Sequence, residues 1–166
     1  MARYGFFIEE NNGEYKLIHT LSSEFHAERA KADSYIKAVA KPNVLSHLND
    51  AADNLSKGRF DYVLDDCRKA MEALTNGAVG FSESLTELVN HNLILQGSNT
   101  RKMDSELLKG VYGSNSTLGS HVTATNPKPD MEQAILGLYV TESCINFLLK
   151  RLEVAQNTGI NLTHWA

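Results

Sequence analysis

The sequence predicts a mainly α-helical protein, a helical bundle with a small N-terminal β-hairpin. Apolar residues recur at helical spacing from about residue 22 to residue 155. A strand-like pattern occupies the first 20 residues instead. The chain has 166 residues, 42% of them hydrophobic, which suits one core and is short for two ordinary domains. We therefore expect residues 1–166 to form a single domain.

The predicted hairpin covers residues 1–20. Two strand-like runs flank Asn12 and Gly13, a pair that tolerates the positive φ angles of a tight turn. Two strands alone are marginally stable, so the hairpin must pack on something. It can cover its own helices, or pair through its free edge with a second copy or a partner strand.

A leading helix over residues 22–40 is predicted to follow and to end before Pro42. The bundle proper covers residues 43–155, with Asn43 as the N-cap of its first helix. Helical spacing and glycine stops give these expected helices: 43–57, 59–75, one beginning near Ser84, 104–112 and 130–155.

Two of these helices carry further signals. Ser84 and Glu87 have the spacing of a capping box, in which a hydroxyl and a carboxylate each accept a hydrogen bond from a free backbone N–H. The last helix has a wide apolar face that includes Ile145, Leu148 and Leu149. Such a face can serve the core and also a partner surface.

Composition excludes several classes of protein. No run of about 18 apolar residues occurs, and the acidic N-terminal stretch does not resemble a signal peptide, so we expect no membrane association. Cys67 and Cys144 are the only cysteines and lie in helical patterns, which favours a reducing, cytoplasmic location over a disulfide scaffold. A net charge of −4 argues against a general nucleic-acid coat protein but permits a local phosphate-binding patch.

The common catalytic signatures are absent from the sequence. It contains no P-loop, no Gly-x-Gly-x-x-Gly, no His-Glu-x-x-His and no nucleophile elbow. The six histidines are scattered, and none lies three or four residues from another. We therefore expect no cofactor and no metal.

Two segments nevertheless carry candidate functional residues. Arg68 and Glu72 lie four residues apart on one helix, which suits either a surface ion pair or a ligand contact. The segment from 112 to 121 is rich in glycine and hydroxyl groups, and no acidic residue occurs from 111 to 129. Its candidate ligand-binding residues are Tyr112, Ser114, Asn115, Ser116 and Ser120, with His121 as a candidate acid or base.

A simpler interpretation of the segment is equally open. It can be a self-hydrogen-bonded loop in which His121 only anchors one helix to the next.

These features together resemble a known family. The helix around residues 66–74, the segment 107–121 and the long last helix are similar to the C-terminal helical domain of bacterial abortive-infection proteins, in the HEPN superfamily. The resemblance covers about residues 40–153 and implies a helical bundle. It also implies a homodimer and, in many members, a metal-independent ribonuclease that uses an Arg and a His four to six residues apart.

Only His121 matches that catalytic pair. The three positions where the arginine would fall hold Ser114, Asn115 and Ser116. A general base loses much of its effect without an electrostatic partner. The sequence therefore favours a non-catalytic, dimeric binding module, with RNA, a nucleotide or a protein as partner.

Two other interpretations stay open. One is a divergent ribonuclease in which His121 acts as the acid or base while Arg68, Tyr112 and the serines orient the phosphate. The other is a structural subunit that assembles through Ile145, Leu148 and Leu149, with no ligand at the loop.

Overall fold

The protein is mainly helical, as the sequence predicts. A computed structural model describes residues 5–11, 14–20, 34, 42–77, 79–94, 103–120 and 128–165. The helices in this part of the chain are α2 (Pro42–Ser56), α3 (Phe60–Glu72), α4 (Phe81–Asn90), α5 (Met103–Ser120) and α6 (Met131–Asn157). Of the predicted leading helix, only Ser34 is described, and it is helical; the rest of 22–40 lies outside the described residues.

Two strands occupy the N-terminal region. Strand β1 (Gly5–Asn11) pairs antiparallel with β2 (Glu14–Thr20), in a register that places Gly5 opposite Thr20. The expected turn residues, Asn12 and Gly13, lie outside the described residues, as do the side chains of both strands. What covers this hairpin therefore stays a prediction.

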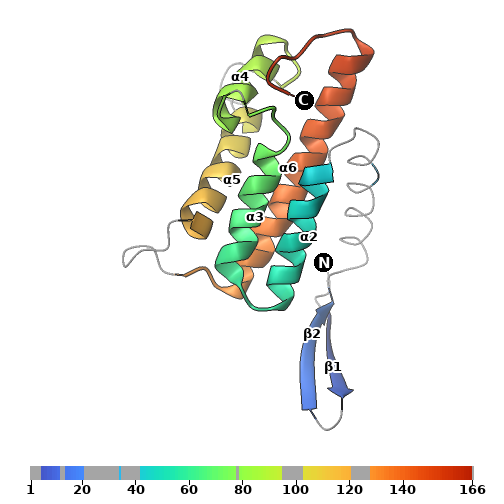
Figure 1. The fold of residues 1–166 in the computed structure, drawn as a ribbon, viewed down its shortest axis with the longest axis vertical. Coiled ribbons are helices and arrows are strands. Elements are labelled where there is room, and N and C mark those ends of the chain that lie inside the picture. Colours follow the sequence, from blue (N-terminus) through green and yellow to red (C-terminus); the bar gives the residue numbers. More distant parts are fainter. Residues whose placement is uncertain are drawn as a thin grey trace.

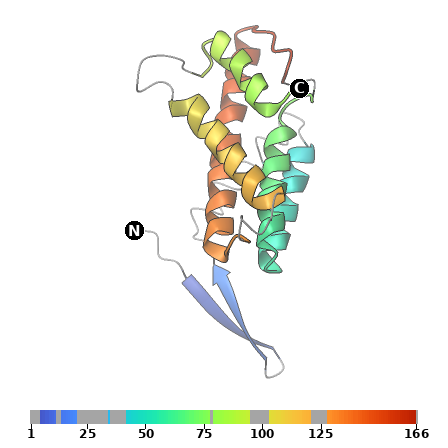
Figure 2. The same cartoon turned by 90° about the vertical axis from the view of Figure 1, so that its left-hand side faces the viewer.

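Helix α3 is the centre of the bundle. It packs against α2, α5 and α6, and Figure 1 shows it between α2 and α5 with α6 behind. Helix α6 runs along the length of the bundle, and α4 lies at the end that the C-terminal residues also reach (Figures 1 and 2).

The core draws apolar side chains from all of these helices. It includes Leu48 of α2, Met71 of α3 and Leu85 of α4, each almost completely buried. Full burial of one such side chain contributes about 1.5–3 kcal/mol. Ile145, Leu148 and Leu149 of α6 are also completely buried. The suggestion that these three residues meet a partner is therefore wrong, because they face the core of their own bundle.

A glycine follows α2 as expected, whereas α3 already ends at Glu72, before the expected stop at Gly77. Gly58 follows α2 with a φ of 69°, and Gly77 lies beyond α3 with a φ of 73°. At its start, α2 already includes Pro42, one residue before the predicted N-cap at Asn43. Proline fits the first helical turn because the N–H it lacks would have no partner there.

The capping box predicted at Ser84 and Glu87 is wrong. Helix α4 begins at Phe81, one turn earlier, and buries that ring in the core. The hydroxyl of Ser84 instead donates to the carbonyl of Gly80 at 3.2 Å.

A capping box occurs at the start of α6. The backbone N–H of Gln133 donates to Asp130 Oδ1 at 2.8 Å, and the backbone N–H of Asp130 donates to Gln133 Oε1 at 3.0 Å.

The loop expected after residue 112 is helical as far as Ser120. Helix α5 passes through Gly113 and Gly119 without interruption. At Gly119 the lack of a side chain permits close packing, because an added Cβ would lie 2.5 Å from the backbone nitrogen of Asp65 in α3. This glycine therefore lets two helices approach each other, where the sequence suggested a loop. Among the described residues, no helix is long and apolar enough to cross a membrane.

Candidate functional site

Helices α3 and α5 bring together three of the residues singled out from the sequence. Arg68 Nη1 contacts Glu72 Oε1 at 2.7 Å, the expected ion pair. The hydroxyl of Tyr112 donates to the same Glu72 oxygen at 2.6 Å, although the two residues lie 40 positions apart. We call Arg68, Glu72 and Tyr112 the α3–α5 network.

Each nitrogen of the Arg68 guanidinium in this network contacts a carboxylate. Besides Glu72, it contacts Asp65 Oδ1 through Nη2 at 2.8 Å and through Nε at 3.2 Å. Lys69 lies beside it, 2.7 Å from Asp65 Oδ2 and 3.5 Å from Asp66 Oδ1. Three carboxylates thus surround two cations, which leaves no surplus positive charge for a phosphate.

The pKa values follow from these contacts. Burial alone would raise the pKa of Asp65, but the hydrogen bonds and charges of Lys69 and Arg68 bring it below its usual value. Burial and the Glu72 carboxylate raise the pKa of the Tyr112 hydroxyl. Tyr112 therefore stays protonated near neutral pH and acts as a hydrogen-bond donor.

The other polar candidates on α5 point elsewhere. Asn115 is 2% exposed, and its amide donates to Thr141 Oγ1 on α6 at 2.8 Å. Ser114 is exposed and Ser116 is half-buried. These side chains face different sides of the helix, so they do not form a single cradle for a ligand.

The last two candidates cannot be placed. Ser120 is the final residue of α5, and its side chain is not described. His121 lies outside the described residues. Its role as an acid or base therefore stays a prediction.

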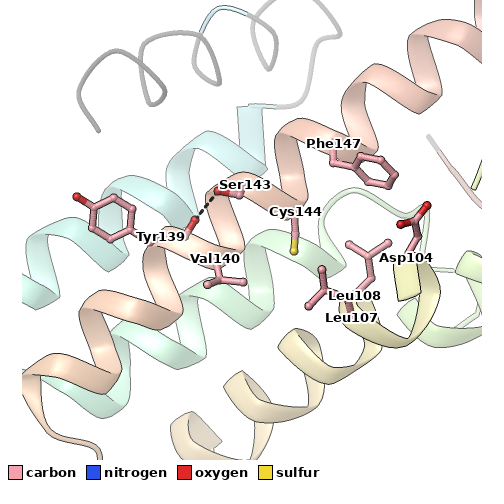
Figure 3. Close-up of a pocket in the computed structure, with 8 residues that line it drawn as sticks. All are labelled: Asp104, Leu107, Leu108, Tyr139, Val140, Ser143, Cys144 and Phe147. Carbon is pink, nitrogen blue, oxygen red and sulfur yellow. Dashed lines mark hydrogen bonds between the residues drawn. The ribbon is translucent and has the colours of Figure 1, made fainter. Parts of the chain in front are cut away.

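An apolar groove lies between α5 and α6 (Figure 3). Its volume is about 320 Å³, and it is lined by Asp104, Leu107 and Leu108 from α5 and by Tyr139, Val140, Ser143, Cys144 and Phe147 from α6. Leu107 is 56% exposed, while its neighbour Leu108 is buried. The hydroxyl of Ser143 is used within the helix, since it donates to the carbonyl of Tyr139 at 3.0 Å. The groove thus offers mainly apolar surface.

The sequence of α5 alone did not reveal this groove. Adjacent leucines on a helix can both be buried, as Leu148 and Leu149 of α6 are. The exposure of Leu107 depends on how α5 packs on α6, which the local sequence of α5 does not specify.

The cysteines are not poised as nucleophiles. Burial raises the pKa of Cys67 to about 12 and that of Cys144 to about 11. The thiolate is the reactive form, so both remain inert thiols at neutral pH.

A second hollow, of about 360 Å³, lies at the start of α4 beside Lys109 and Tyr112. It combines a helix N-terminus with a lysine, which resembles an anion site. However, a Cβ added to Gly80 would lie 2.5 Å from Glu83 Oε2, so that carboxylate already covers the start of the helix. A second anion would meet its charge.

Within the described residues, no group of three or more His, Cys, Asp or Glu side chains could hold a metal ion. No protein-family model, curated protein or solved structure matches the chain. The geometry of the α3–α5 network and of the apolar groove therefore carries the functional argument.

Proposed function

We propose that this protein is a non-catalytic, HEPN-like binding module that forms a homodimer through the α5–α6 groove. The resemblance to abortive-infection proteins supports a role in bacterial phage defence, in the cytoplasm. The observation that carries the proposal is the apolar groove with the exposed Leu107 beside it.

The groove suits a second copy of the same chain. In a two-fold symmetric dimer, the same surface of each subunit contacts the other. Leu107 lies on the wall of the groove and is 56% exposed, so a two-fold axis nearby can place each Leu107 in the groove of the opposite copy.

The α3–α5 network supports the non-catalytic part of the proposal. A ribonuclease of this type needs a cation to stabilise the charge that develops on the phosphorane. Arg68 is the arginine of the network, and its Nη1, Nη2 and Nε all contact Asp65 or Glu72. A phosphate would have to compete with both carboxylates for this guanidinium.

Light scattering on purified protein tests the dimer. We expect the wild type to be a dimer and Leu107→Asp to be a monomer, because a buried carboxylate would lack a partner in the groove. Leu136→Asp is the matched control, since Leu136 is a 64% exposed leucine of α6 that does not line the groove. A monomeric wild type, or a Leu107→Asp variant that stays dimeric, would contradict the proposal.

The ribonuclease alternative is tested separately. Wild type and His121→Ala are incubated with labelled mixed-sequence RNA in EDTA. We expect intact RNA with both proteins. Cleavage by the wild type alone would establish a metal-independent ribonuclease that uses His121, and would replace the non-catalytic proposal without affecting the dimer.

A further inference from the structure

The chain beyond α6 leaves the helix and returns to α4 in a non-helical form. Helix α6 ends at Asn157, and Gly159, with a φ of 70°, begins the turn. The segment 160–165, which we call the strap, then reaches the end of the bundle where α4 lies (Figures 1 and 2).

One carboxylate holds the strap through its backbone. Glu87 Oε1 accepts from the backbone N–H of Thr163 at 2.6 Å and from its hydroxyl at 2.7 Å. Glu87 Oε2 accepts from the backbone N–H of His164 at 2.9 Å. A single ionised group thus binds two consecutive peptide N–H groups, and hydrogen bonds to an ionised acceptor are about twice as strong as neutral ones.

A tryptophan anchors the end of the strap. Trp165 is 7% exposed, and its indole N–H donates to the carbonyl of Ser84 at 3.0 Å. Its ring packs edge-on against Phe81, with 6.2 Å between ring centroids. Its backbone also forms an antiparallel bridge with Thr75.

The loop after α3 completes the site. The backbone N–H of Asn76 donates to the carbonyl of His164 at 3.0 Å, and the Asn76 side-chain amide donates to the carbonyl of Thr163. We call Thr75, Asn76, Phe81, Ser84 and Glu87 the α4 receptor. The receptor contacts the Thr163 hydroxyl, backbone N–H and C=O groups and the Trp165 indole, all of which a bent Thr-x-Trp peptide would also offer.

The fit of the strap itself is incomplete at one atom. His164 Nδ1 is buried and has no hydrogen-bond partner among the described residues. It lies 3.6 Å from Glu87 Oε2, outside hydrogen-bond distance. A buried polar atom without a partner weakens the interaction that encloses it.

We propose that the α4 receptor is a docking site for Thr-x-Trp peptides, and that the strap of the same chain fills it as a displaceable segment. Trp165 is the one residue of the strap that is buried in the core, while Ile160 and Leu162 are only partly buried against it. Segments with few buried contacts open at lower free energy than the core helices. The receptor can therefore exchange the strap for a peptide while the bundle stays folded.

The consequence of exchange reaches the α3–α5 network. Phe81, which contacts Trp165, also stacks on Tyr112, with 5.0 Å between centroids. Tyr112 in turn donates to Glu72. A bound peptide that repositions Phe81 would act directly on this network.

Fluorescence anisotropy with a labelled peptide tests the proposal. The peptide copies residues 160–165 with both ends blocked, and the protein is the full chain with Trp165→Ala, which frees the receptor from its anchor. We expect binding at least about tenfold tighter than to the wild type, where the tethered strap competes at high effective concentration. Adding Glu87→Ala should abolish binding, whereas Glu83→Ala, on the same helix but outside the strap contacts, should retain it.

Two results would overturn the proposal. The first is a folded Trp165→Ala protein, verified by circular dichroism, that shows no saturable binding. The second comes from hydrogen exchange on the wild type and remains available if that variant does not fold. We expect the amides of Thr163 and His164 to exchange at least about tenfold faster than those of the core of α6. Equal rates would mean that the strap is a fixed part of the fold.

Discussion

Glycine-to-alanine substitutions within α5 should have opposite effects on stability at two positions. At Gly119 an added Cβ would lie 2.5 Å from the nitrogen and 2.9 Å from the Cα of Asp65, and these are backbone atoms that cannot rotate away. At Gly110 nothing lies within 4 Å of the same added atom. Both glycines belong to the same helix, so their difference isolates the contact with α3.

The magnitudes follow from the two environments. Alanine in place of an exposed helical glycine gains about 0.8–1 kcal/mol from helix propensity, which is our expectation for Gly110→Ala. At Gly119 the same gain is opposed by separation of α5 from α3, and overpacking of a tight contact costs about 1–3 kcal/mol, occasionally more. Because the contact at Gly119 is with rigid backbone, we expect an overpacking cost at the upper end of that range. Subtracting the gain in helix propensity leaves a net destabilisation of about 1–2 kcal/mol for Gly119→Ala.

Urea denaturation followed by far-ultraviolet circular dichroism measures both changes in the free energy of unfolding. Gly137→Ala provides an intermediate case, because its added Cβ would meet the end of the buried Leu64 side chain and not backbone. If Gly119→Ala were as stable as Gly110→Ala, the close approach of α5 to α3 would be refuted.

Two further predictions concern titration and thiol chemistry. Burial would raise the pKa of Glu87, but hydrogen bonds from Thr163 and His164 lower it in the folded protein. The stability that ionised Glu87 contributes is therefore present above its unfolded-state pKa and is lost as the pH falls through its folded-state pKa. The fluorescence emission of Trp165, the single tryptophan, should therefore shift to longer wavelength as the pH is lowered below about 4. The Glu87→Gln variant should show this shift already at neutral pH. Unchanged emission of the wild type down to about pH 3 would contradict the prediction. The pKa values of Cys67 and Cys144 are about 12 and about 11, so at pH 8 both thiols should react with a thiol reagent only after the protein unfolds. The reaction is followed by absorbance. Rapid reaction of the native protein would show that one of the thiols is exposed.

Helices with a clear apolar stripe could be predicted from the sequence to within a few residues. The structure has α3 over Phe60–Glu72 where 59–75 was expected, and α6 over Met131–Asn157 where 130–155 was expected. Both predictions depend on local information, which is spacing along one helix and the turn that ends it.

Helix α5 was mispredicted because its glycines and hydroxyl residues locally favour a loop. What they do in the structure depends on neighbours far away in the sequence. Gly119 contacts Asp65, and Asn115 contacts Thr141. No pattern within residues 112–121 contains that information.

The candidate site was predictable to the same limited extent. The Arg68–Glu72 ion pair follows from their spacing, but the addition of Tyr112 requires α5 to pack on α3. The apparent capping residue Glu87 has a different role, since it binds backbone groups 76 and 77 positions away. Such long-range contacts arise only when the whole bundle is assembled.

The buried pair of Asn115 and Thr141 also decides how α5 and α6 align. Apolar helix surfaces can slide past one another with modest loss, because one leucine replaces another in the contact. A slide of one turn, about 5.4 Å, would break the 2.8 Å hydrogen bond and leave two polar groups buried without partners. That would cost about 1–3 kcal/mol for each group. This pair therefore favours a single register of the two helices that form the groove, and the shape of the groove depends on it.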